Sequence, residues 1–314
     1  MSQWAGIESG AAATSAPPRA AQAAAGRRPP VRLRRSERLV LGSIDSAAHV
    51  LQRRARDVLL GSAVFMVPML ALNTGLAVLA FNEFDRFDSV FGQRGYVGVE
   101  TGFAFVAIVV QSFTAHLIGA YAATYLVRYQ MGGDPRIREC VGAVLRRLPL
   151  LLATWLLTHW WALLLALALL NADMTTVAGV GWMLGFGVAA LSALVLLTAP
   201  VVMAERAGLR SVPRAVRLAR TRYGAAFGFV LSCGLLAWLL MLFIGFLPDL
   251  AEATGLITFG SYGWLMQGIS SQLALLVVVP FSAITTAQFY LQVRVHAEGL
   301  DIVMAADRAF GAQP

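Results

Sequence analysis

The sequence predicts an all-α protein: a polytopic membrane bundle of six transmembrane helices, with three amphipathic helices at one membrane surface. Three observations lead to this fold class. The 314-residue chain is 58% hydrophobic and only 13% charged, whereas soluble domains carry about 25% charged residues. Six long stretches contain no charged side chain at all. The arginines are concentrated in alternate connections between those stretches, as expected of a chain that crosses a membrane six times.

Each apolar stretch is long enough to cross a bilayer, since a helix needs about 20 apolar residues to span the hydrocarbon core. No Asp, Glu, Lys or Arg interrupts any of them. Hydrocarbon, not water, is therefore the solvent in which these segments are stable as helices. The predicted spans are 58–81, 101–127, 148–170, 177–203, 224–247 and 264–293.

The positive charge lies on one side of these spans. Every basic residue is an arginine, and 23 of the 25 fall in the N-terminal segment, two alternate loops and the C-terminal segment. The other three loops hold only Arg86 and Arg94. Arginine-rich connections stay in the cytoplasm, so both termini are predicted to be cytoplasmic. The formal net charge of +8 then faces anionic lipid headgroups, and we expect no nucleic-acid partner.

The chain divides into three regions. Residues 1–40 are rich in Ala, Pro and Arg, a composition that cannot bury enough apolar surface to fold, so they are predicted to be a disordered cytoplasmic tail. Its basic run serves either as a lipid contact or as a passive topogenic signal. Residues 41–310 form the membrane domain, and 311–314 are a short tail.

Three cytoplasmic segments are predicted to be short amphipathic helices that run into a span. They open at Ser43, at Asp134-Pro135 and at Ser211, where Ser and Asp are suited to cap a helix. Each carries a Leu-x-Arg in register, which indicates either an internal repeat or the ordinary composition of juxtamembrane helices. In the headgroup plane their arginines would face lipid phosphates. The candidate contacts are Arg53, Arg146, Arg147, Arg214, Arg217 and Arg220.

Polar residues inside the spans are the candidates for a solute pathway. No span contains an acid; span two holds His116 and span three holds His159. Span six carries a polar stripe of which four members, with the two histidines, could line a cavity. Hydrogen bonding between helices is the alternative for both groups and the commoner use. The stripe members concerned are Gln267, Ser271, Thr285 and Gln288.

Small residues recur in spans four and five, for example Gly185, Gly187, Gly224 and Gly228. Such spacing predicts close approach of two backbones within the chain. The two cysteines, Cys140 and Cys233, indicate neither a disulfide framework nor a zinc site. No catalytic constellation is identifiable, so we expect no enzymatic activity and no cofactor.

The segment 289–301, Phe-Tyr-Leu-Gln-Val-Arg-Val-His-Ala-Glu-Gly-Leu-Asp, resembles the end of a bacterial multi-pass family. This family is the membrane domain first described attached to glycerophosphodiester phosphodiesterases. Its characteristic residues here would be Tyr290, Arg294 and Glu298-Gly299-Leu300-Asp301, and Glu205 in the interior segment. Ser43 and Gln292 stand where the family commonly has an acid. The resemblance implies a stand-alone relative in a bacterial inner membrane, without the separate catalytic barrel.

These observations favour a non-enzymatic scaffold or accessory module. It would organise lipids, or a membrane-protein partner, at the cytoplasmic leaflet. The alternative hypothesis is a transporter or exporter of a small or lipidic solute, using span six and the two histidines. A lipid-modifying enzyme would need a nucleophile or metal site at the leaflet, and none is visible in the sequence.

Overall fold

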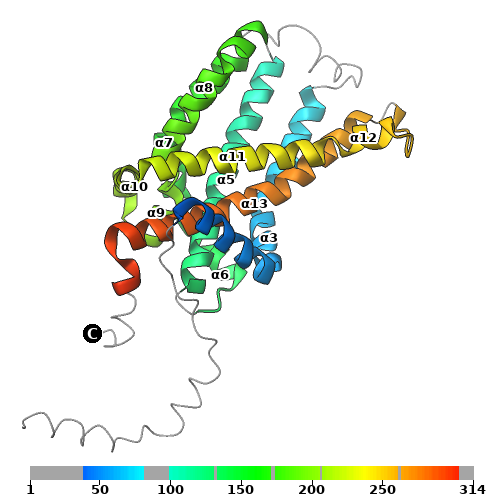
Figure 1. Cartoon of the computed structure of the whole chain (residues 1–314). Helices are drawn as coiled ribbons and strands as arrows, with labels where there is room; N and C mark the ends of the chain where they lie inside the picture. The colour runs from blue at the N-terminus through cyan, green and yellow to red at the C-terminus, as the bar shows by residue number, and fades with distance from the viewer. Residues whose placement is uncertain are drawn as a thin grey trace, which may run out of the picture.

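A computed structural model of the chain describes residues 38–80, 99–130, 133–170, 174–205, 207–260 and 263–303. Regular structure in these ranges is entirely helical (Figure 1). Six of the helical segments are long and apolar enough to cross a membrane, which confirms the predicted all-α, six-span class. The helices are α3 (Leu39–Ala80), α5 (Val99–Gln130), α6 (Ile137–Arg146), α7 (Leu148–Leu170), α8 (Met174–Val195), α9 (Thr198–Glu205), the 3-10 helix η2 (Gly208–Arg210), α10 (Ser211–Thr221), α11 (Tyr223–Gly245), α12 (Leu247–Ala253) and α13 (Gly263–Glu298).

The long helices meet at one end of the molecule. In Figure 1, α3, α5, α7 and α8 rise from this end, and the antiparallel pair α11 and α13 runs across them. The last helix, α13, packs against α3, α5 and α11. The short helices α6, α9 and α10 pack among the same ends of the long ones. We call this part of the bundle, with α6, α9, α10 and the adjoining ends of α3, α5, α11 and α13, the convergent end.

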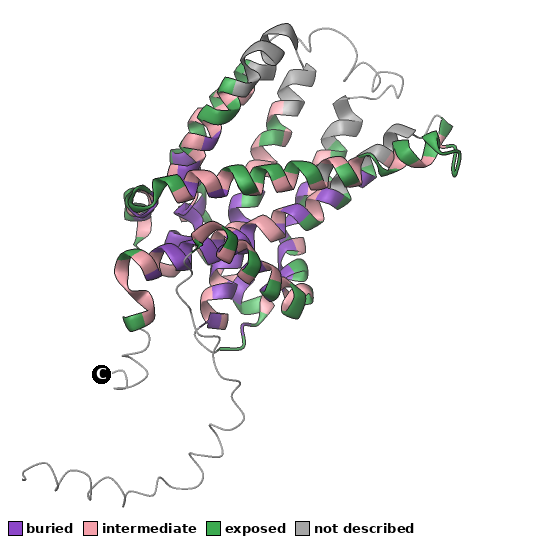
Figure 2. Cartoon of the chain, viewed as in Figure 1, coloured by how far each residue is buried: buried purple, intermediate pink, exposed green. Residues whose placement is uncertain are grey.

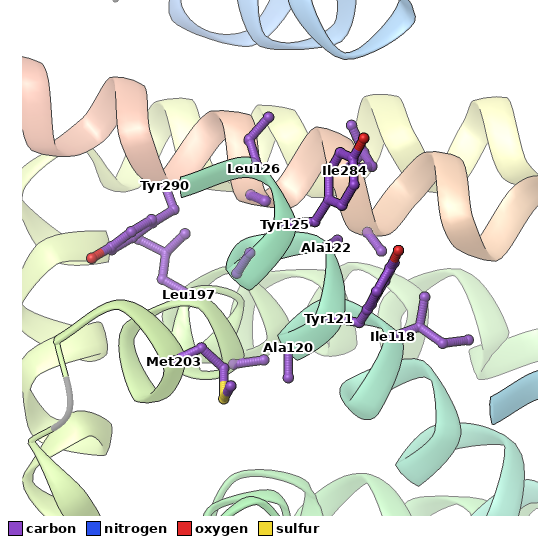
Figure 3. Packing of buried hydrophobic residues seen from close by; sticks show 14 of the residues in the cluster. Ile118, Ala120, Tyr121, Ala122, Tyr125, Leu126, Leu197, Met203, Ile284 and Tyr290 are labelled. Atoms are coloured by element: carbon purple, nitrogen blue, oxygen red, sulfur yellow. The ribbon is translucent and has the colours of Figure 1, made fainter. Parts of the chain in front are cut away.

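The core lies at the convergent end. Figure 3 shows Tyr121 and Tyr125 of α5 among side chains that come from α9 and α13, including Met203 and Ile284. Away from it, most described residues are intermediate or exposed (Figure 2). The exposed ones include large apolar residues such as Val67, Leu164, Phe186 and Phe243. Lipid tails are as apolar as these side chains, so exposing them in a bilayer costs little.

Two of the three amphipathic helices begin at other residues than predicted, and none of the three predicted side-chain caps forms. The first helix begins at Leu39, and the Ser43 hydroxyl donates to the Leu39 carbonyl (2.7 Å) from within the helix. The second begins at Ile137, with Arg136 at the N-cap position, so Asp134 does not cap it. The third begins at Ser211 as predicted, but its side chain makes no capping hydrogen bond. Tertiary packing and the preceding η2 turn, not capping side chains, position these helices.

The structure contains two helix breaks: one between the first amphipathic segment and its span, as expected, and one inside span four, which hydropathy did not predict. Arg54 has non-helical angles (φ −136°, ψ 29°) and separates the amphipathic first part of α3 from its apolar continuation. Span four is broken into α8 and α9 around Leu196. Pro200 explains the second break, because it lacks the N–H that would bond to the Leu196 carbonyl. By contrast, Gly299 ends α13 with φ +63°, the left-handed geometry that glycine adopts at low cost.

The helices of spans four and five, α8 and α11, pack against each other, but four of their glycines make no tight contact with another segment. A Cβ added at Gly185, Gly187, Gly224 or Gly228 would meet no atom within 4 Å. The tight glycine is instead Gly61 of α3, where a Cβ would lie 2.0 Å from the Tyr121 ring. A tyrosine from the neighbouring helix fills the space over Gly61, which the glycine spacing within one span does not reveal.

Candidate functional site: an ionic cluster at the convergent end

Four charged side chains from three helices meet at the convergent end. Glu205 ends α9, Arg214 lies on α10, and Arg294 and Glu298 occupy the last two turns of α13. Arg214 Nε lies 2.9 Å from Glu205 Oε2, and Arg294 Nε lies 2.9 Å from Glu298 Oε2. Arg214 also pairs with Glu298, and Arg294 Nε lies 3.7 Å from Glu205 Oε1. We call these four residues the ionic cluster; two positive and two negative charges balance within it.

Tyr290 joins the ionic cluster to the core. Its hydroxyl donates to Glu205 Oε1 (3.1 Å) and accepts from Arg294 Nη1 (3.3 Å). The tyrosine is fully buried and its ring stands beside Leu197 in Figure 3. The four charged side chains keep only 16–29% of their surface exposed. Half-buried charges need partners to offset lost hydration, and here each has two.

The ionic cluster sets the roll of α10 about its own axis. Burial alone would lower the pKa of Arg214, but hydrogen bonds to Glu205 and Glu298 outweigh it, so the pKa is raised and the side chain stays charged. With Arg214 directed inward, Ala215 and Leu218 are buried against the bundle. Since α10 is a regular helix, Arg217 and Arg220 lie opposite the buried face formed by Ala215 and Leu218, and they are exposed.

The six candidate lipid contacts therefore fall into two groups. Arg214 is held by the ionic cluster, and Arg147 Nη1 donates to the Val202 carbonyl (2.6 Å). The other four are exposed, and none forms an ion pair with a residue in the described ranges. They are Arg53, Arg146, Arg217 and Arg220. Contact of these arginines with lipid stays a prediction.

A second network surrounds Asp57 in α3. Tyr125 donates to its carboxylate (3.0 Å), and Tyr121 donates to its backbone carbonyl (2.8 Å). Arg54 approaches the same carboxylate (3.5 Å) and pairs with Asp134 before α6 (3.1 Å). This network fixes the break in α3 against α5 and the α5–α6 connection. The sequence feature that pointed to this network is Asp57 itself, a single acid directly before an apolar stretch.

The two intramembrane histidines lie together. The ring centroids of His116 in α5 and His159 in α7 are 5.8 Å apart. Thr285 and Gln288 of α13 are buried, and the Thr285 hydroxyl donates within its own helix to the Phe281 carbonyl. No described contact joins them to the histidines. Gln267 and Ser271 belong to α13, but their side chains lie outside the described part of the structure. A polar cavity formed by these six residues, and with it solute transport, stays a prediction.

The structure gathers most of the residues that carry the family resemblance. Glu205, Tyr290, Arg294 and Glu298 all belong to the ionic cluster or bond to it. Sequence reasoning missed that Arg214 completes the cluster, because its partners lie on other helices. In the described ranges, no group of three or more His, Cys, Asp or Glu residues is placed to hold a metal ion.

Comparison of the chain with protein-family models, curated proteins and solved structures gave no significant match. Membership of the family named above therefore stays a prediction, carried by the motif residues alone.

Proposed function

We propose that this protein is a non-enzymatic membrane module that binds anionic lipid headgroups at the cytoplasmic leaflet of a bacterial inner membrane. Its role would be to organise those lipids, or a partner membrane protein that binds the same lipids. One observation carries this proposal. On α10, the inward arginine is neutralised by two carboxylates of the chain, whereas Arg217 and Arg220 are exposed and have no ion-pair partner among the described residues.

The exposed face of α10 has the chemistry of a phosphate-binding surface. Arg217 and Arg220 are three residues apart, so their side chains are neighbours on one face of the helix. Guanidinium groups bind phosphate oxygens through two parallel hydrogen bonds. A basic side chain near an anionic leaflet contributes about 1 kcal/mol of binding free energy. The segment 207–222 contains no acid that would compete for these arginines.

The distribution of arginine supports the cytoplasmic side. The connections that carry α6 and α10 and both terminal segments hold 23 of the 25 arginines, and such connections stay in the cytoplasm. The exposed arginines of α10 would then lie at the inner headgroup layer, where anionic lipids create a negative surface potential.

The ionic cluster is a positioning device in this proposal. It ties α10 to the ends of α9 and α13 through Glu205 and Glu298, which prevents α10 from rolling its inward arginine outward. Because both carboxylates are already paired, they do not repel lipid phosphates. The same contacts therefore hold the helix and leave its outer face net positive.

The test measures lipid retention by the purified full chain in mild detergent, with native mass spectrometry, after adding phosphatidylglycerol or phosphatidylcholine. The wild type is expected to retain phosphatidylglycerol preferentially. The double variant Arg217→Gln/Arg220→Gln should weaken that retention about 30-fold, from two contributions of about 1 kcal/mol, and added salt should weaken the wild type.

The matched control is Arg136→Gln/Arg138→Gln, which removes the same charge from exposed positions at the start of α6. It should reduce retention by less than threefold. Equal binding of the two lipids by the wild type would refute the proposal. So would equal losses in the two double variants, because the effect would then follow net charge and not the α10 surface.

A further inference from the structure

The contact between α5 and α7 contains a second polar group that lipid binding does not use. His116 lies in α5 and His159 in α7, both far from the ends of their helices. Their ring centroids are 5.8 Å apart, with the ring planes at 80°. Neither residue contacts the ionic cluster or the network around Asp57 in any described interaction.

His116 has an unsatisfied nitrogen. The residue is only 8% exposed, and its Nε2 atom is buried without a hydrogen-bond partner in the described structure. A buried nitrogen of this kind costs about 1–3 kcal/mol when no partner replaces water. In the low-dielectric surroundings of a membrane span, the free-energy cost of leaving this nitrogen without a partner is larger.

The hydrogen bonds of His159 fix its tautomer. Its Nδ1 atom lies 3.2 Å from the Trp155 carbonyl and 2.8 Å from the Thr158 hydroxyl oxygen. A carbonyl only accepts, so Nδ1 carries the proton and Nε2 keeps a free lone pair. Histidines that ligate metals commonly donate their other ring N–H to a backbone carbonyl, which fixes the tautomer in this way.

The spacing suits one ion between the two rings. Metal–imidazole bonds of about 2 Å each would place the ring centroids about 6 Å apart, close to the 5.8 Å seen here. The 80° between the planes is compatible with this arrangement, since each ring can rotate about its own metal–nitrogen bond. A direct hydrogen bond between two ring nitrogens would bring the centroids closer together.

The surroundings favour an ion of low charge. Two neutral imidazoles leave the full charge of the ion in a low-dielectric site, and the cost of burying a charge rises with its square. Zinc prefers four ligands in a tetrahedron, whereas cuprous copper is stable with two. Trp155 stacks on His159 at 6.0 Å and Phe113 meets Trp155 edge-on at 5.4 Å. Aromatic faces stabilise a nearby cation.

The geometry points to a cuprous ion site formed by His116 and His159 at the α5–α7 contact, with His116 Nε2 and His159 Nε2 as the two ligands. This inference is independent of the proposed lipid binding, because the two sites share no residue.

The test uses the full chain in detergent with Cys140 and Cys233 changed to Ala, because thiolates bind cuprous copper on their own. Anaerobic titration of cuprous ion against a chromophoric chelator should show one tightly bound ion per chain. X-ray absorption should report two nitrogen ligands at about 2 Å. The substitutions His116→Leu and His159→Leu should each weaken binding at least 100-fold, whereas the control His49→Leu should leave it unchanged.

A fourth variant separates ligation from folding. His116→Met replaces the imidazole by a thioether, which also binds cuprous copper, so binding should be kept and the nitrogen count should fall to one. Three results would overturn the inference: no competition with the chelator, binding unchanged in both leucine variants, or zinc bound as tightly as copper. A melting temperature measured for each variant identifies those that do not fold.

Discussion

The neighbouring helices α11 and α13 differ in how they are solvated, although both are long and apolar. They run antiparallel side by side (Figure 1), and α11 is the more hydrophobic of the two. Among the residues whose burial the structure describes, none in the most apolar stretch of α11 is buried, whereas more than half of those in the corresponding stretch of α13 are. The more hydrophobic helix is thus the one that faces outward.

The hydropathy of a helix in a membrane protein therefore indicates which solvent surrounds it, and not how deeply it is buried in the bundle. In water, the most apolar helix would be the most buried, because exposure costs about 25 cal/mol per Å². In a bilayer that cost disappears for lipid-facing residues. Specific contacts then decide which helix is central. Buried polar groups such as Thr285 and Gln288, and the ionic cluster at its end, distinguish α13 from α11.

The contrast is sharpest for two phenylalanines. Phe289 of α13 is fully buried and stacks on Phe229 of α11 with ring centroids 4.5 Å apart, whereas Phe243 of α11 is 75% exposed. Phe289→Ala should lower the free energy of unfolding by about 3–5 kcal/mol through cavity formation, and Phe243→Ala by less than about 0.5 kcal/mol. Unfolding by a denaturing detergent in mixed micelles measures both. Equal losses would show that α11 is buried in the folded protein.

Two glycines test the same contrast with an added methyl group. In Gly61→Ala the new Cβ would overlap the Tyr121 ring. The ring must therefore move, and its hydroxyl loses the hydrogen bond that it donates to the Asp57 carbonyl. Overpacking of this kind costs about 1–3 kcal/mol. Gly234→Ala on α11 meets no atom and should raise stability by about 0.5–1 kcal/mol. The same unfolding assay reports both; a destabilised Gly234→Ala would indicate an unrecognised contact on α11.

Chemical labelling tests exposure with the smallest perturbation. In a chain with Cys140 and Cys233 replaced by Ala, Leu239→Cys on α11 should react with a membrane-soluble maleimide at least about tenfold faster than Ile284→Cys on α13. Leu239 is 40% exposed and Ile284 is fully buried, and reagent must reach the thiolate. Mass spectrometry of the labelled chain gives the rates. Similar rates after controlling for unfolded protein would contradict the assigned burial.

The sequence predicted the fold class and the number of spans because these depend on local composition. Long uncharged stretches such as 148–170 and 224–247 matched α7 and α11 within a few residues. Prediction failed where neighbours in space intervened. Ser43 and Asp134 are residue types that commonly cap helices. Ser43 instead lies inside α3, and Asp134 pairs with Arg54 across the bundle.

The candidate site was predicted in its parts and not in its arrangement. The terminal motif identified Tyr290, Arg294 and Glu298, and the distribution of arginine identified Arg214 as a candidate lipid contact. Neither pattern indicated that these side chains meet in space. The two histidines were identified singly, and their pairing required the placement of α5 against α7. Thr285 and Gln288 were expected to line a cavity with the histidines. The Thr285 hydroxyl donates within its own helix, and the cavity stays a prediction.

The solvent of each segment, the number of apolar spans and the concentration of arginine in alternate connections all follow from residues that are neighbours along the chain. Each of these is a sum over neighbouring residues, and transfer free energies add along the chain. Contacts between distant parts of the chain set which apolar helix is central and which arginines are neutralised. Arg214 and Glu298 are 84 positions apart, and a Coulomb energy depends on their distance in space and on their burial. Composition carries neither quantity.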